Sequence, residues 1–274
     1  LRDKGIGIIY ISHRMDEIKI ITDRVTVMRD GEYVGTLISK DCTKDDIINM
    51  MVGRTIYEEP KSVSNVPDNA PVVLKVEHLQ AGKMVQDISF ELRKGEILGF
   101  SGLMGAGGTE TARVIFGADK KQGGDIYVNG KKVEINSPQD AVKAGIGYLS
   151  EDRKRYGVVL DKTIAENTTM ASLEKFVRGL FIDKKDEEST AQDYVERLNT
   201  KTPTVTTPTL SLSGGNQQKV VIAKWLVRDC DILIFDEPTR GIDVGAKSEI
   251  YHLMNELAAS GKSIIMISSE LPEI

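Results

Sequence analysis

One segment of the sequence occurs twice, with the second copy 256 positions after the first. Residues 1–18 and 257–274 are identical at 8 of 18 positions without a gap, and both carry a helix-like stretch into an apolar run. A repeat this long is typical of a duplicated domain, because solenoid units recur every ~20 to 50 residues. Two similar helix-to-strand junctions arising by coincidence are the alternative. We expect the chain to be a piece of a longer protein that holds the end of one domain copy and nearly all of another.

The residues between the repeats suggest where the first copy ends. Val25–Leu37 predicts two strands around an Asp30-Gly31 turn, and a helix capped at Thr43 is expected to reach about Val52. Residues 54–71 contain three prolines and no apolar periodicity, which indicates a linker. We therefore assign residues 1–53 to the first copy, 54–71 to the linker and 72–274 to the second copy.

Short apolar strands alternate with helices in the second copy, which predicts an α/β fold with a mainly parallel core sheet. An Asn129-Gly130 pair marks a hairpin. Strands are expected at residues 8–12 in the first copy and at 72–76, 87–92, 97–101, 146–149, 232–235 and 263–267 in the second. Helices are expected at residues 107–116, 138–144, 186–198 and 214–227.

Composition excludes several classes of protein. The 36 Lys and Arg against 41 Asp and Glu give a net charge of -5, which argues against a nucleic-acid partner. No apolar run approaches the ~18 residues of a membrane-spanning helix. The two cysteines, Cys42 and Cys230, lie far apart and predict neither a disulfide framework nor a zinc site, so a reducing compartment is expected.

A glycine-rich loop, GLMGAGGT at residues 102–109, follows the strand expected at 97–101. Between a buried strand and a helix, such a loop presents backbone N–H groups to a phosphate. Its frame matches GxxxxGK[ST], but Gly108 takes the place of the lysine and Thr109 keeps the hydroxyl that can bind magnesium. Taken alone, a plain strand-to-helix turn explains the loop equally well. The phosphate-binding candidates are Gly102, Gly105, Gly107, Gly108 and Thr109.

Two carboxylates, Asp236 and Glu237, close the apolar strand expected at 232–235. In this arrangement one carboxylate can hold magnesium through water and the other can polarise an attacking water. A buried strand that simply enters a polar turn is the alternative interpretation.

A third motif, LSGGNQQ at residues 212–218, precedes the helix expected at 214–227. Ser213 suits the N-cap, and Gly214 and Gly215 leave the N–H groups of the first turn open to an anion. Taken alone, Ser-Gly-Gly can begin any capped helix, which is the alternative interpretation of this motif. The three motifs in this order favour a nucleotide-binding protein.

Together these motifs resemble the ATP-binding cassette (ABC) proteins, and most closely the tandem-cassette subunits of bacterial monosaccharide importers of the ribose, galactose and xylose type. The matching stretches are GLMGAGGTE at 102–110, EDRK at 151–154 and SGGNQQK at 213–219. That family usually has arginine where this chain has Gly108. The resemblance implies a P-loop NTPase-like cassette with a mainly parallel core sheet, an antiparallel β subdomain and a helical subdomain at about 151–212.

The resemblance also implies ATP and Mg²⁺ as ligands. Thr109, Asp236 and Glu151 would then surround the magnesium, with Glu151 in place of the usual glutamine, and Glu237 would be catalytic. His13 matches the histidine that contacts the γ-phosphate, whereas the second copy has Ser269 at that position. Residues 79–87 offer no aromatic ring for the adenine. The signature residues that would contact a nucleotide across a pair of cassettes are Ser213, Gly214, Gly215 and Gln218.

Two unlike sites follow from this resemblance. The competent site would combine the phosphate loop of the first cassette of the same polypeptide with His13 and the signature residues of this chain. The other would use the degenerate loop at 102–109, so the isolated chain is expected to be almost inactive.

We expect the whole protein to be a peripheral ATPase at the cytoplasmic face of the membrane that powers monosaccharide import. Its partners would be permease subunits and, through them, a periplasmic or extracellular sugar-binding protein. A non-hydrolysing regulatory cassette is an alternative. A soluble ABC ATPase of translation or repair is another, although basic patches would be expected there.

Overall fold

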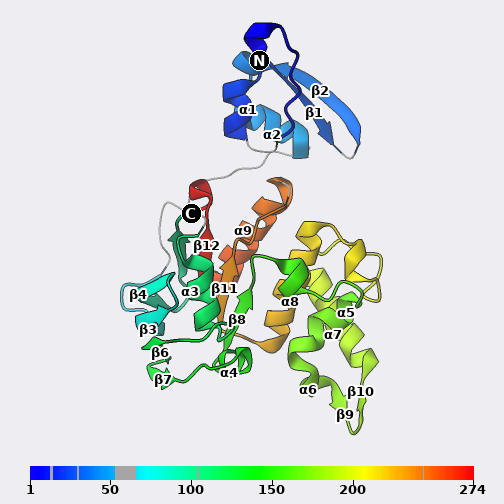
Figure 1. Cartoon of the computed structure of the whole chain (residues 1–274). Coiled ribbons are helices and arrows are strands. Elements are labelled where there is room, and N and C mark those ends of the chain that lie inside the picture. Colours follow the sequence, from blue (N-terminus) through cyan, green and yellow to red (C-terminus); the bar gives the residue numbers. More distant parts are fainter. Residues whose placement is uncertain (13–14, 30, 53–65, 104, 243) are drawn as a thin grey trace. The chain divides into compact units, whose positions relative to one another are not determined.

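The computed structural model describes residues 1–12, 15–29, 31–52, 66–103, 105–242 and 244–274 (Figure 1). They form two compact units, one within residues 1–62 and 242–249, the other within 63–241 and 250–274. The linker expected at 54–71 lies mostly outside the described residues, so the domain boundaries stay a prediction. No described helix has both the length and the apolarity needed to cross a membrane.

The first unit contains the predicted hairpin and the predicted capped helix. Its elements are α1 (Met15–Ile21), β1 (Arg24–Arg29), β2 (Glu32–Ile38) and α2 (Lys44–Val52). The two strands are antiparallel, and their last pair joins Arg29 to Glu32. The N–H of Thr43 donates to Asp46 Oδ2 (2.7 Å), and the N–H of Asp46 donates to Thr43 Oγ1 (3.1 Å). This reciprocal cap explains why the helix begins there.

The prediction of a strand at residues 8–12 is wrong. These residues form no strand, and the side chains of Ile9 and Ile11 are 92% and 93% exposed. A strand needs neighbours to take its backbone hydrogen bonds. No described strand of this unit pairs with residues 8–12, whereas the repeated segment at the C-terminal end pairs on both sides.

The core of the second unit is the predicted parallel sheet. Its strands are β5 (Ile97–Ser101), β8 (Ile146–Leu149), β11 (Ile232–Asp236) and β12 (Ser263–Ser268), in the spatial order β5-β12-β11-β8. Every residue of β8, β11 and β12 is buried, as expected for a parallel sheet that is covered on both faces. All four strands point the same way, so the loops after them gather at one edge.

A second sheet of this unit is antiparallel, as the resemblance implied. Its strands are β3 (Val72–Ala81), β4 (Val85–Arg93), β6 (Gly123–Val128) and β7 (Lys131–Val133), in the order β4-β3-β6-β7. The Asn129-Gly130 hairpin is confirmed, with positive φ at both residues (49° and 75°). β3 and β4 run beyond the predicted ends, because mutual pairing continues past the apolar alternation.

Seven α-helices lie in the described residues of this unit. They are α3 (Gly108–Ile115), α4 (Pro138–Lys143), α5 (Ile164–Thr169), α6 (Leu173–Phe176), α7 (Lys184–Arg197), α8 (Gly214–Arg228) and α9 (Val244–Ala259), of which the last begins in the stretch assigned to the first unit. In Figure 1, α5 and α7 lie beside α8 and form the helical part that the resemblance implied. A short hairpin of β9 (Val177–Arg178) and β10 (Phe181–Ile182) was not predicted.

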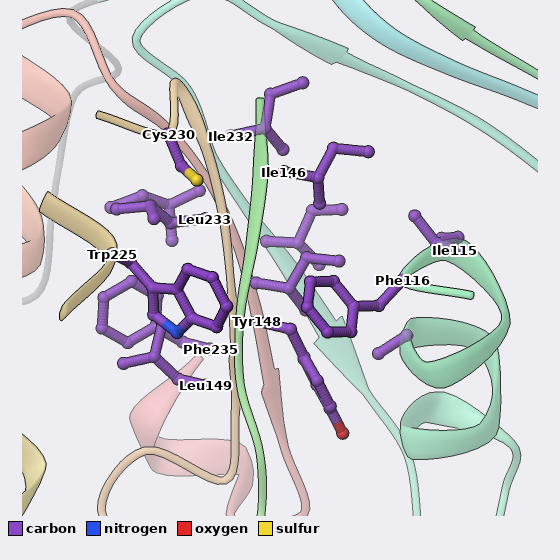
Figure 2. Close-up of a cluster of buried hydrophobic side chains, with 14 of the residues drawn as sticks. Ile115, Phe116, Ile146, Tyr148, Leu149, Trp225, Cys230, Ile232, Leu233 and Phe235 are labelled. Atoms are coloured by element: carbon purple, nitrogen blue, oxygen red, sulfur yellow. The ribbon is translucent and has the colours of Figure 1, made fainter. Parts of the chain in front are cut away.

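Aromatic packing fixes β8 between α3 and α8. Phe116, which follows α3, meets Tyr148 of β8 at 5.3 Å and Trp225 of α8 at 5.7 Å between ring centroids. Figure 2 shows these rings with Ile146, Leu233 and Phe235 in one cluster. The cluster holds β8 in place and so fixes the position of the Tyr148 hydroxyl.

Candidate functional site

A cavity of about 440 Å³ lies where the parallel strands end. Loops that follow β5, β8, β11 and β12 all contribute to its wall. This edge is the usual ligand site of parallel α/β sheets. Of the residues singled out from the sequence, the cavity brings together Gly102, Gly105, Gly107, Gly108, Thr109, Glu151 and Glu237.

The glycine-rich loop needs glycine for steric reasons. Gly105 and Gly107 have φ of 81° and 99°, in the left-handed region that other residues rarely adopt. A Cβ on Gly107 would lie 2.6 Å from the carbonyl oxygen of Met84. Gly107 is also the N-cap of α3, so the free N–H groups at the start of α3 face the cavity. The loop is shaped to admit an anion against its backbone.

The position of the missing lysine is closely packed. A Cβ on Gly108 would lie 2.9 Å from Cγ2 of Ile267, whose side chain is buried on β12. A larger residue here therefore requires Ile267 to move.

Asp236 is fully buried at the end of β11 and accepts two hydroxyl hydrogen bonds. Thr109 Oγ1 donates to Oδ1 (2.9 Å), and the hydroxyl of Tyr148 donates to Oδ2 (2.7 Å). Burial raises the pKa of Asp236, while the bonds from Tyr148 and Thr109 oppose that rise. Sequence reasoning missed Tyr148, because an aromatic residue in a buried strand carries no sign of a polar role.

Glu237 has an unusual backbone conformation at the cavity wall. Its φ is 47°, which is uncommon for a residue with a side chain and is often found at functional sites. Its N–H donates to the carbonyl of Ile267 (3.0 Å), and its Oε1 accepts from the N–H of Ser269 (2.7 Å). Glu237 is thus tied to the residue that replaces the histidine in the repeat. His13 itself lies outside the described residues.

Glu151 is engaged by a cation that the sequence analysis did not single out. Its Oε1 pairs with Nη1 of Arg240, and both residues line the cavity. Arg153 Nη1 donates to the carbonyl oxygen of Arg240 (2.9 Å). Glu151 could therefore bind magnesium only after leaving Arg240. The sequence carries one signal for this pair. Glu151 follows β8 and Arg240 follows β11, and these neighbouring parallel strands end at the same edge of the sheet. No three His, Cys, Asp or Glu side chains of the described chain cluster as a metal site.

The signature residues do not line this cavity. Ser213 is the N-cap of α8, but its Oγ accepts from Asn216 Nδ2 (2.9 Å) instead of capping a backbone N–H as expected. A Cβ on Gly214 would lie 2.5 Å from Nη2 of Arg153, so the guanidinium occupies the space that glycine leaves. Gly215 and Gln218 are buried in the first turns of α8. Their role toward a second site stays a prediction.

Comparison with protein families agrees with this geometry. The family described as "ABC transporter" matches residues 85–240, a span from β4 through the glycine-rich loop and the carboxylates to Arg240. The chain belongs to the ABC transporter family. The resemblance predicted from the three motifs is thereby confirmed.

Two relatives match this ABC chain over its whole length. The "Putative ribose/galactose/methyl galactoside import ATP-binding protein 1" of Burkholderia lata is 58% identical over 275 residues, which are 100% of this chain and 54% of the relative. "Ribose import ATP-binding protein RbsA" of Clostridium tetani is 51% identical over 276 residues, again 100% of this chain and 54% of the relative. The chain spans about half the length of these relatives.

Solved structures of ABC cassettes share the fold. A dimeric cassette in a post-hydrolysis state with ADP and Pi has a TM-score of 0.61 and 20% identity, covering 73% of this chain and 89% of that one. A cassette in its ADP conformation has a TM-score of 0.62 and 22% identity, covering 73% and 82%. The predicted P-loop NTPase-like cassette fold is confirmed.

Proposed function

We propose that this chain is part of an ATP-binding subunit that energises the import of a monosaccharide, and that its cavity binds ATP with Mg²⁺. The observation that carries the proposal is the glycine-rich loop, whose N–H groups at the start of α3 open onto a cavity beside the part-buried Thr109–Asp236 hydrogen bond. The names of the two relatives, which match the whole chain, support a ribose- or galactose-type sugar.

The residues beside the loop suit magnesium. Mg²⁺ prefers oxygen ligands and takes one or two carboxylates together with substrate phosphates. Thr109 and Asp236 offer such oxygens next to each other, and Glu151 would join them once its pair with Arg240 opens. The metal would neutralise phosphate charge. Thr109 and Asp236 would hold the phosphates next to the N-terminus of α3.

Glu237 is proposed as the general base that polarises the attacking water. In this conformation its carboxylate accepts from the backbone of Ser269, which has neither the charge nor the reach of a histidine. Gly108 offers no cation either. We therefore propose that in the isolated chain this site binds ATP with almost no turnover. The competent site would join His13, Ser213, Gly214, Gly215 and Gln218 of this chain to the first cassette's phosphate loop.

A regulatory cassette that holds nucleotide without hydrolysis is the second candidate. The close packing of Ile267 against Gly108 favours it, because the side chain leaves little room for a cation at that position. In either case the partners would be permease subunits at the cytoplasmic face of the membrane and, through them, a sugar-binding protein outside it.

The proposal is tested with the full-length protein. It should copurify with a membrane permease, and in proteoliposomes its ATPase activity should rise when a sugar-binding protein loaded with ribose or galactose is added. A matched sample with the unloaded binding protein is the control. Copurification without a permease, together with ATPase activity indifferent to sugar, would reject import. Substoichiometric turnover with an intact first cassette would favour the regulatory candidate.

A further inference from the structure

The cavity is acidic although a nucleotide is anionic. Among the described residues that line it, three carboxylates face a single guanidinium, that of Arg240, and no lysine or histidine is present. The carboxylates are Glu110, Glu151 and Glu237. Magnesium offsets part of a triphosphate's charge, but a protein cation at the terminal phosphate is the usual further need. Gly108 cannot supply it.

Arg240 has a fixed backbone and a side chain that can move. Its N–H donates to the carbonyl of Glu237 (3.1 Å), and its own carbonyl accepts from Arg153 Nη1 (2.9 Å). Its side chain is 49% exposed, so the guanidinium can swing through solvent rather than through packed core. The base of the side chain is thus held beside Glu237 while its head remains free to change partner.

The present partner of Arg240 is easily exchanged. The Glu151 side chain that it contacts is 35% exposed, and ion pairs at this exposure contribute little to stability. A phosphate offers the guanidinium a bidentate partner with more charge than a carboxylate has. Exchange is therefore favoured when a phosphate enters the cavity.

We propose that Arg240 supplies the cation that the glycine-rich loop lacks. In the nucleotide-free chain Arg240 rests on Glu151, and when ATP binds its guanidinium transfers to the oxygens of the terminal phosphate. This inference rests on the proposed function, because it requires the cavity to bind ATP. Arg240 would then distinguish ATP from ADP. ADP lacks the γ-phosphate, so the ion pair between Arg240 and Glu151 would stay in place when ADP binds.

Binding of two nucleotides to the chain tests the inference. Arg240→Gln should weaken the binding of Mg-ATP by about ten- to a hundredfold, the loss expected for one charge-assisted contact, and should change Mg-ADP binding by less than about twofold. Arg240→Lys should restore part of the ATP affinity. Arg178→Gln is the matched control, because it opens a comparably exposed arginine–carboxylate pair with Asp186 outside the cavity lining. Calorimetric titration measures each affinity, and thermal melts verify that each variant is folded.

The outcomes separate the inference from the function on which it rests. If the wild-type chain binds ATP and Arg240→Gln weakens ATP and ADP equally, or neither, the cavity binds nucleotide but Arg240 does not contact the terminal phosphate. If the wild-type chain binds neither nucleotide, the proposed function of the cavity and the inference both fail.

A measurement on the wild-type chain avoids any risk of misfolding. Phenylglyoxal modifies accessible arginines, and mass spectrometry locates the product. Mg-ATP should protect Arg240 strongly and Mg-ADP weakly, while Arg178 should react equally in both. Equal modification of Arg240 with the two nucleotides would overturn the inference.

Discussion

The hydroxyl of Tyr148 is expected to hold Asp236 in its ionised form, and Tyr148→Phe tests this directly. The hydroxyl donates to Asp236 Oδ2 at 2.7 Å in a buried environment. Phenylalanine keeps the ring that packs on Phe116 and removes only the donor. One oxygen of a fully buried carboxylate would then lose its partner, while Thr109 would still donate to the other.

The expected cost follows from the charge of the acceptor. A hydrogen bond to a charged group contributes about 1.5–3 kcal/mol, and here it stabilises the ionised form of Asp236. Burial already raises that pKa above its ordinary value of 3.8, so ionisation of Asp236 destabilises the folded chain once the pH exceeds this value. Removing a donor raises the pKa further. The loss should therefore be full above the raised pKa, where Asp236 is ionised in the folded chain, and shrink as the pH falls through it.

Chemical denaturation at pH 8 and at pH 5 measures the free energy of unfolding of the wild type and the variant. We expect Tyr148→Phe to lose about 1.5–3 kcal/mol at pH 8, or about 3–12 °C in melting temperature, and clearly less at pH 5. Tyr156→Phe is the control, because Tyr156 is 54% exposed and keeps its ring. A loss that is the same at both pH values, or under about 0.5 kcal/mol at pH 8, would refute the electrostatic reasoning.

Three further predictions concern single residues. Gly108→Lys should tighten ATP binding about tenfold by calorimetry, yet lower the melting temperature because its Cβ displaces Ile267; unchanged affinity would show that the loop is not poised for phosphate. Burial lowers the pKa of Lys224, which donates to the carbonyl of Gly157, to about 8. The folded chain then loses this proton before the unfolded chain does, so stability should rise from pH 8 to 9, and urea titrations of Lys224→Met should lack that rise. In the full-length protein, His13→Ala should abolish most turnover in a steady-state assay while nucleotide binding persists, and unchanged turnover would remove its proposed role.

Much of the fold could be predicted because local and tertiary signals agree. The buried strands β11 and β12 are continuous apolar runs, and the Asn129-Gly130 turn requires the backbone angles that these residues tolerate. The segment at 8–12 has the same apolar pattern as β12 but forms no strand. An apolar run indicates that a segment can be buried. Whether the segment forms a strand depends also on which strands lie beside it to pair with.

The candidate site was predictable in its backbone and less so in its charges. The glycines of the loop and Glu237 meet at one edge of the sheet, because strand order fixes the edge at which the loops gather. The pairing of Arg240 with Glu151 and the bond from Tyr148 to Asp236 join residues 89 and 88 positions apart. Such contacts depend on side-chain directions in the folded chain, which no local pattern encodes.

A nucleotide-retention assay tests most directly the claim that this cavity binds ATP without appreciable turnover. The chain is incubated with Mg-ATP labelled at the α-phosphate and passed through a desalting column, and the retained nucleotide is identified over several hours. We predict that the chain retains nucleotide, that it remains ATP, and that Glu237→Gln retains it equally. Formation of ADP in excess over the protein, abolished by Glu237→Gln, would contradict the claim, as would the absence of any retained nucleotide.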